Sequence, residues 1–298
     1  MAHAQTQPST NPSHYYVPPS SVWPIVAAVA LVSTMLGAAV FLNDWAGSVA
    51  FLPGVLLLVL TFTGWFHRVI VENQDGDYNL QVDRSFRLGM LWFIFSEVMF
   101  FAAFFGALYY ARVFSVAWLG GHGQHVATHK YLWSEFSAAW PTNGPAKVGG
   151  HPDGSFQTVP ALGLPLINTL ILLASGVTVT IAHHALRAKN RAILLAFLAV
   201  TFLLGFTFVF LQAHEYGEAY RELGLKLSTG IYGSTFFMLT GFHGLHVTIG
   251  AIMLLVIWVR VLRGHFTPER HFAFEAVAWY WHFVDVVWLG LFVFVYWL

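Results

Sequence analysis

The sequence predicts an all-α polytopic membrane protein with seven transmembrane helices, and three observations lead to that class. Charged residues make up only 9% of the 298 residues, hydrophobic residues make up 57%, and the mean hydropathy is +0.64. A soluble domain carries about 25% charged residues, which cover its surface. Seven apolar stretches reach the roughly 20 residues that a membrane-spanning helix needs. Apolar runs such as residues 51–61 do not alternate with polar residues, which excludes the period-two strands of a membrane β-barrel.

The composition also excludes several classes of function. The 14 basic and 14 acidic residues balance, and no basic cluster exists, so we expect no nucleic-acid partner. The absence of cysteine excludes disulfides, thiolate nucleophiles, Cys-ligated metals and a Cys-attached haem. Every lysine lies outside the apolar stretches, which excludes a retinal Schiff base, and no phosphate-binding Gly-rich loop ending in Lys-Ser or Lys-Thr occurs.

The elements follow one another in a simple order. Residues 1–21 are polar and lack Lys and Arg, which predicts a loosely held tail rather than a secretory signal. The spans are expected at residues 22–42, 48–66, 88–114, 159–186, 192–212, 229–259 and 275–297. The chain thus divides into helices one and two over residues 22–66, a loop over residues 67–87, and helices three to seven over residues 88–298. The connection 115–158 is long and rich in Gly, Pro, His and aromatic residues, which favours an ordered or functional segment.

Basic residues predict the orientation in the membrane. The loops on the side of the N-terminus hold nine of the Lys and Arg residues, which are Arg68, Arg84, Arg87, Arg187, Lys189, Arg191, Arg260, Arg263 and Arg270. The opposite side holds five, which are Arg112, Lys130, Lys147, Arg221 and Lys226. Loops rich in Lys and Arg stay in the cytoplasm. The N-terminus is therefore predicted to be cytoplasmic, and the loop 115–158 external.

Glu97 is the acidic residue of the third span, about 14 Å from the start of that span at 1.5 Å per residue. A carboxyl group near the middle of a bilayer needs a partner, and its neutral form is favoured there. Two interpretations follow. Glu97 is either a hydrogen-bonded group that ties the third span to a neighbour, or a proton-exchanging or regulatory carboxyl.

The last span carries Glu275, His282 and Asp285, and His282 and Asp285 share a helix face. We expect these residues, with His243 and His246 of the sixth span, to form a structural polar network that holds the helices together. A His pair spaced by three could also bind a metal. Because Glu-x-x-His spacing is absent from every span, a di-iron site is not expected, and we predict no metal ligands on this chain.

Read together, these segments resemble subunit III of the haem-copper cytochrome c oxidases over all seven spans. The most specific piece is His271-Phe-Ala-Phe-Glu-Ala-Val-Ala-Trp-Tyr-Trp-His-Phe-Val-Asp-Val-Val-Trp288. The segment Tyr232-Gly-Ser-Thr-Phe-Phe-Met-Leu-Thr-Gly-Phe-His-Gly-Leu-His-Val247 is nearly as specific. Ser96-Glu-Val-Met-Phe-Phe101 and the Gln212 to Tyr216 region agree as well.

The resemblance implies a V-shaped arrangement, with helices one and two on one arm and helices three to seven on the other. It implies bound phospholipid in the split, no catalytic residue and no redox cofactor on this chain, and haem and copper in the partner subunit. The implied partners are oxidase subunit I as the main contact, subunit II, and cytochrome c as substrate of the complex. The implied role is to support proton uptake and to stabilise the catalytic subunit of a proton-pumping oxidase in a bacterial cytoplasmic membrane.

Particular residues match positions of functional interest in that family. Glu97 matches its buried, carbodiimide-reactive carboxyl. The lipid-binding positions correspond to Trp65, Phe66, Glu72, Arg260, Arg263, His265 and Arg270. Departures occur after Glu72, where Asp75 and Asp77 stand in place of a His-containing segment, and Arg270 replaces the first His of a usual pair. The two aspartates are expected to repel a lipid phosphate.

Two other functions stay open from the sequence. The first is the equivalent subunit of a quinol oxidase, although such subunits usually have five spans. The second is a proton-coupled secondary transporter that acts through Glu97 and Asp285.

Overall fold

The computed structural model describes residue 17 and residues 19–298, and within them the chain is helical and contains no strand. Most of the predicted N-terminal tail lies outside the described residues. The long helices are α1 (Trp23–Leu42), α2 (Leu52–Asp75), α3 (Leu80–Tyr109), α6 (Leu164–Arg187), α7 (Arg191–Arg221), α8 (Gly230–Leu262) and α9 (Phe272–Leu291). Each is long and apolar enough to cross a membrane, which confirms the all-α class and the seven spans.

Several helices extend beyond the predicted spans. The predicted loop 67–87 is almost entirely helical, because α2 continues to Asp75 and α3 begins at Leu80. Ion pairs between residues four apart stabilise these polar turns, with Arg68 bonded to Glu72 and Arg87 to Asp83, both at 2.8 Å. At its other end, α3 runs through a π-helical segment, Tyr110–Ser115, into the short α4 (Val116–Leu119).

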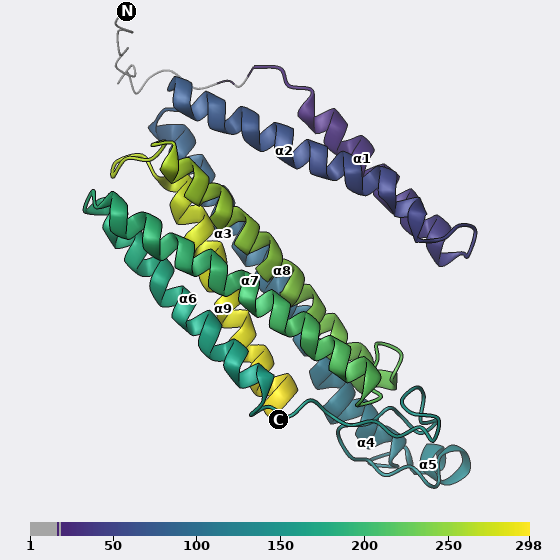
Figure 1. Cartoon of the computed structure of the whole chain (residues 1–298). Helices are drawn as coiled ribbons and strands as arrows, with labels where there is room; N and C mark the ends of the chain where they lie inside the picture. Colours follow the sequence, from purple (N-terminus) through teal and green to yellow (C-terminus); the bar gives the residue numbers. More distant parts are fainter. Residues whose placement is uncertain (1–16, 18) are drawn as a thin grey trace, which may run out of the picture. The chain divides into compact units, whose positions relative to one another are not determined.

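The chain consists of two compact units, which meet within α3, between Leu88 and Gly89. In the first unit, α1 and α2 lie side by side along their length (Figure 1). They approach closely at Gly54, where any side chain would collide with the backbone of Thr34. The cytoplasmic N-terminus and the V-shaped arrangement of two plus five helices stay predictions.

The second unit is a helical bundle in which α6 contacts α7 and α9, and α8 contacts α7 and α9 (Figure 1). The residues of α3 beyond Gly89 join it through aromatic contacts, such as the edge-to-face pair of Phe100 and Phe242 at 5.1 Å. Its largest fully buried side chains are aromatic or Leu, and they include Trp281 and Trp288 of α9. The core of this unit is therefore built around α9.

Trp281 sits in a slot that two glycines leave open. A Cβ atom at Gly205 of α7 would lie 2.6 Å from its ring, and one at Gly250 of α8 would lie 2.8 Å from it. The indole Nε1 donates a hydrogen bond of 2.9 Å to Oγ of Ser175 in α6. Small residues let helices approach closely where lipid provides no hydrophobic driving force. One side chain of α9 thus contacts three neighbouring helices.

The connection between α4 and α6 is ordered, as its length led us to expect. It contains α5 (Val126–Leu132), and it packs against the loop between α7 and α8. Backbone hydrogen bonds join Gln157 to Leu223 at 2.8 Å, and Tyr232 to Thr142 at 3.2 Å. The ring of Tyr232 lies 5.6 Å from that of Trp140, an aromatic residue of this connection. These contacts attach the loop to the rim of the bundle.

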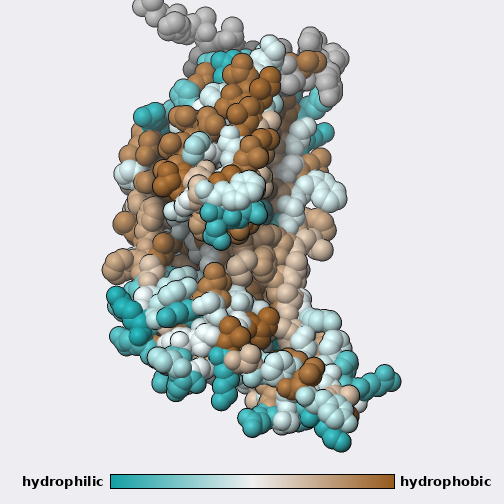
Figure 2. All heavy atoms as spheres, turned by 90° about the vertical axis from the view of Figure 1, so that its right-hand side faces the viewer, coloured by the Kyte–Doolittle hydropathy of each residue, from teal (hydrophilic) through white to brown (hydrophobic). Residues whose placement is uncertain are grey.

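The surface separates apolar and polar residues. Hydrophobic side chains cover much of the helical part of the face shown in Figure 2, and hydrophilic side chains gather at the end that carries α4 and α5. In the most apolar part of the third span only 6% of the residues are buried, compared with 50% in the last span. The third span therefore offers an apolar surface to lipid or to another subunit.

We predict opposite effects of the same substitution at two glycines of α8. Gly250→Ala places a methyl group against Trp281, and such overpacking lowers the free energy of unfolding by about 1–3 kcal/mol. At Gly244 nothing lies within 4 Å of the added atom, so Gly244→Ala should raise stability by up to about 1 kcal/mol through helix propensity. Thermal denaturation of the detergent-solubilised protein measures both changes in stability. Equal shifts of the denaturation midpoint in the two variants would contradict close packing of Gly250 against Trp281.

Candidate functional site

The candidate functional site contains Glu97 of α3 and His246 of α8. Oε2 of Glu97 and Nε2 of His246 are 2.9 Å apart, with the side chains 21% and 13% exposed. Nδ1 of His246 lies 2.6 Å from the carbonyl oxygen of Phe242. Within this chain Glu97 is thus a partly exposed group with a partner, and its burial in the membrane stays a prediction. The contact ties the third span to a neighbour, as one of the two interpretations expected.

The geometry restricts where the protons of this pair can be. A carbonyl oxygen only accepts, so Nδ1 of His246 carries a hydrogen and donates it to Phe242. Nε2 then either accepts a proton from a neutral Glu97 or donates one to its carboxylate. Both arrangements hold one shared proton, and in both the pair has no net charge. The pair is therefore neutral while it holds this proton, and loss of the proton would leave a net charge of −1 on the pair.

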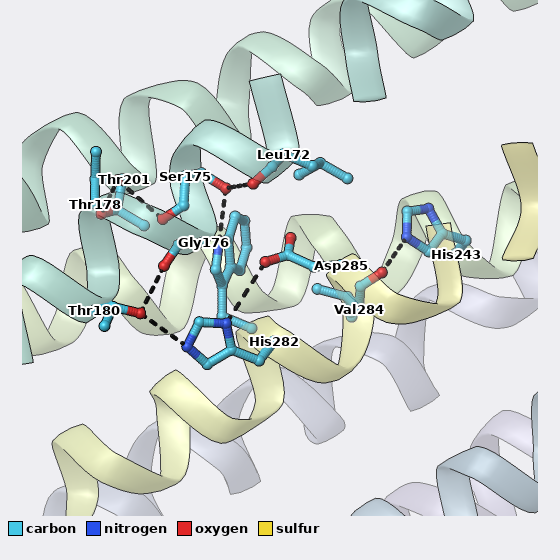
Figure 3. A network of polar contacts seen from close by, with 11 residues as sticks. Leu172, Ser175, Gly176, Thr178, Thr180, Thr201, His243, His282, Val284 and Asp285 are labelled. Atoms are coloured by element: carbon cyan, nitrogen blue, oxygen red, sulfur yellow. Dashed lines mark hydrogen bonds and ion pairs between the residues drawn. The ribbon is translucent and has the colours of Figure 1, made fainter. Parts of the chain in front are cut away.

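A second polar group joins α6 to α9 at mid-length (Figure 3). Nδ1 of His282 lies 3.8 Å from Oδ2 of Asp285, and Nε2 of His282 lies 3.4 Å from the hydroxyl of Thr180. His282 is 46% exposed on its side chain, whereas that of Asp285 is 10% exposed. His282 and Asp285 share a helix face, and His282 also contacts α6 through Thr180.

The other predicted network residues have separate partners. His243 is fully buried, and its Nε2 lies 3.0 Å from the carbonyl oxygen of Val284 in α9 (Figure 3). Glu275 lies near the start of α9, where its Oε1 is 3.1 Å from Nε2 of His271. The five residues His243, His246, Glu275, His282 and Asp285 form several local contacts, and their role as a structural polar network stays a prediction. Helix spacing predicts a shared face but does not determine depth in the bundle.

Sequence reasoning missed a buried carboxyl in α7. Glu215 is 1% exposed, and its Oε1 accepts hydrogen bonds from Tyr296 at 2.7 Å and from Gln212 at 3.2 Å. The fifth span was expected to end at residue 212, which placed Glu215 in a loop, but α7 continues to Arg221. The i, i+3 spacing of Gln212 and Glu215 was the available signal, because those positions share a helix face.

The predicted lipid-binding residues divide between the two units. In the first unit Trp65 is 39% exposed and Phe66 is 62% exposed, so both are accessible on the surface of α2. Glu72 is engaged within its own unit, because its two oxygens accept from Nε of Arg68 and from the hydroxyl of Tyr78, each at 2.8 Å. Of the predicted lipid-binding residues in the first unit, Trp65 and Phe66 are therefore the accessible ones.

In the second unit the basic residues surround the end of α8. Gly264 adopts φ = 74° and ends the helix, and the amide of His265 donates to the carbonyl of Arg260 at 3.1 Å. Arg260 is only 8% exposed, and its guanidinium lies 4.5 Å from the centre of the Phe266 ring. Loss of hydration, with the charges of Arg260 and Arg263, lowers the pKa of His265. Its ring is therefore neutral at pH 7, and it offers hydrogen bonds rather than charge.

Comparison with known proteins identifies the family. The family described as cytochrome c oxidase subunit III matches residues 13–130 and 131–298. Subunit 3 of cytochrome c oxidase from Pongo abelii is 43% identical over 284 residues, covering 95% of this chain and 96% of that protein. The proteins of that name from Dugong dugon and Gadus morhua are each 41% identical over 290 residues, covering 97% of this chain and 98% of theirs.

The chain belongs to the cytochrome c oxidase subunit III family. Its function is accordingly that of subunit III in cytochrome c oxidase, an oxidoreductase complex of several subunits in a membrane. The resemblance inferred from the sequence is confirmed. Nothing in the comparisons supports a quinol oxidase subunit or a secondary transporter.

The buried cluster of Glu215 yields a prediction for this subunit III. Tyr296→Phe removes the shorter of the two hydrogen bonds to Oε1 of Glu215 and leaves a buried polar group with one donor fewer. This should destabilise the subunit by about 1–3 kcal/mol. The matched control is Tyr109→Phe, whose side chain is 59% exposed. Thermal release of the subunit from the purified oxidase measures the effect, and identical midpoints for the two variants would show that the cluster is unimportant.

Proposed function

We propose that this chain is a non-catalytic subunit of its oxidase, and that the Glu97–His246 pair holds a proton for the catalytic subunit. The observation that carries the proposal is the 2.9 Å contact between the two side chains, both of which keep partial exposure. A proton-exchanging group needs both a partner and access. A carboxyl group with a purely structural role would need a partner but no access.

The redox chemistry belongs, in this proposal, to partner subunits that hold haem and copper. His243 and His246 lend support, because each directs Nε2 to a protein group rather than toward a shared ion. The main partner is oxidase subunit I, with subunit II nearby, and cytochrome c is the substrate of the complex. Apolar side chains of α3, such as Trp92 at 70% exposure and Met99 at 54%, offer surface for such a contact.

Phospholipid binding is the second part of the proposed function. Arg263 and Arg270 lie near the end of α8, and the exposed Trp65 and Phe66 lie on α2. Arg side chains attract lipid phosphate at a membrane surface, and Trp favours the interfacial region. Asp75 and Asp77 oppose the phosphate, so the basic residues after α8 should dominate binding.

The proposed location is a bacterial cytoplasmic membrane, with the N-terminus and the end of α8 on the cytoplasmic side. The excess of Lys and Arg in those loops supports this orientation. The relatives described above come from animals. Fractionation of the source cells, followed by protease digestion of sealed membrane vesicles, tests both the membrane and the orientation.

Glu97→Gln tests the proton-holding role. The amide cannot exchange a proton, so we expect slower proton uptake by the oxidase in sealed vesicles and a shorter catalytic lifetime. The content of haem and of this subunit should stay unchanged, because Gln can still bond to His246. Glu135→Gln, in an exposed loop position, is the control. Loss of the whole complex would instead make Glu97 a structural residue.

Arg263→Gln tests the lipid part. Removal of one interfacial cation should weaken binding of an anionic phospholipid by about 1 kcal/mol, which is about fivefold. Titration of the delipidated oxidase with phosphatidylglycerol, followed by native mass spectrometry, measures the affinity. Arg263→Lys should retain it, and Arg112→Gln, expected on the opposite side of the membrane, should not change it. Equal affinity in all variants would remove Arg263 from the lipid site.

A further inference from the structure

Four polar side-chain atoms in the interior of the second unit have no hydrogen-bond partner within the described part of the chain. They are Nδ2 and Oδ1 of Asn168 in α6, and Oε1 of Gln212 and Oε2 of Glu215 in α7. The three residues are 0%, 4% and 1% exposed. Buried polar atoms in native proteins almost always have partners, so this group indicates a ligand that the protein chain itself does not supply.

Asn168 and Gln212 lie at the same level of the bundle. Trp281 contacts Ser175 of α6 through its indole nitrogen and Gly205 of α7 through its ring. Asn168 comes seven residues before Ser175, and Gln212 comes seven residues after Gly205. Because α6 and α7 pack together and are joined by residues 188–190, they run antiparallel, and both steps lead about 10.5 Å toward the same end. Seven residues are nearly two full turns, so both side chains stay on the interior faces of their helices.

The last helix contacts both sides of this level. The indole nitrogen of Trp288 in α9 donates at 2.9 Å to Thr169, the neighbour of Asn168. Nε2 of Gln212 donates at 3.3 Å to the hydroxyl of Tyr296, which lies in the π-helical segment after α9. The rings of Trp288 and Tyr296 are 5.7 Å apart. Contacts therefore lead from the first turns of α6 through α9 to Gln212 in α7.

The four atoms together need a ligand that both accepts and donates. Nδ2 of Asn168 only donates, whereas its Oδ1, Oε1 of Gln212 and Oε2 of an ionised Glu215 only accept. Exchange of nitrogen and oxygen in the Asn168 amide changes nothing, because both positions lack a partner. A bound cation would satisfy the oxygens but not the amide nitrogen. An added proton on Glu215 would satisfy the carboxyl group and at most one acceptor. Water accepts and donates, and therefore fits the whole group.

We propose that the chain binds at least one internal water molecule between Asn168 of α6 and Gln212 and Glu215 of α7. The water accepts from the amide of Asn168 and donates to the oxygens of Gln212 and Glu215, which gives about three hydrogen bonds, the usual number for buried water. It joins α6 to α7 at this level, as the hydroxyls of Thr178 and Thr201, 2.8 Å apart, join them at another.

Asn168→Leu distinguishes a water-bridged amide from an amide that is merely buried. Leu has a similar size but cannot hold the water, so Gln212 and Glu215 lose a donor. The midpoint for thermal release of the subunit from the purified oxidase should then fall by a few degrees. If Asn168 had no ligand, the same substitution would remove the cost of burying an amide and would raise the midpoint. A raised or unchanged midpoint would overturn the proposal.

A double-substitution cycle separates loss of the water from poor packing of the new side chain. Asn168→Leu and Gln212→Leu remove the same water, so their combined shift of the midpoint should be smaller than the sum of their separate shifts. The matched control combines Asn168→Leu with Ser175→Ala, which removes the bond to Trp281 two turns away, and these two shifts should add. Additive shifts in the first pair would count against a shared water.

A structure of the purified complex, at a resolution that shows ordered water, gives a direct test. Density for water is expected about 2.7–3.2 Å from the amide of Asn168 and from the free oxygens of Gln212 and Glu215, and it should be lost in Asn168→Leu. A map that shows other buried waters but none here would overturn the proposal. Crystals soaked in Tl⁺ check the other ligand, because anomalous density at this point would assign the site to a monovalent cation instead of water.

Discussion

A polar group inside an apolar bundle must find its partner on another helix, and this constraint determines how α9 is held. The indole nitrogens of Trp281 and Trp288 donate to hydroxyls of Ser175 and Thr169 on α6, each at 2.9 Å. An unsatisfied hydrogen-bond donor in the hydrocarbon region of a membrane costs several kcal/mol. Two bonds a few turns apart fix both the rotation and the register of α9 against α6.

The polar residues of α9 follow from that register. Glu275 meets His183 and His271 near the beginning of the helix, His282 and Asp285 meet α6 at its middle, and Tyr296 meets Glu215 of α7 beyond its end. The three contacts lie at different positions along α9, and two of them join it to α6.

Much of this architecture could be predicted from the sequence, because hydrophobic length alone identifies membrane helices. All seven spans, the subunit III family and the pairing of His282 with Asp285 follow from local patterns. The partner of Glu97 could not be predicted, because His246 lies 149 positions away in the chain and only packing brings the two together. Glu215 was missed for a different reason. The apolar stretch of the fifth span ends at residue 212, whereas α7 continues with more polar residues to Arg221.

The neutrality of the Glu97–His246 pair has a consequence for the response to the membrane potential. A proton that moves between the two atoms travels at most 2.9 Å, about a tenth of a hydrocarbon core roughly 30 Å thick. A potential of 100 mV changes the energy of a whole crossing charge by about 2.3 kcal/mol, so it biases this step by only about 0.2 kcal/mol. Proton exchange within the pair is therefore nearly independent of voltage. The distribution of the proton between Glu97 and His246 would be nearly the same with and without a membrane potential.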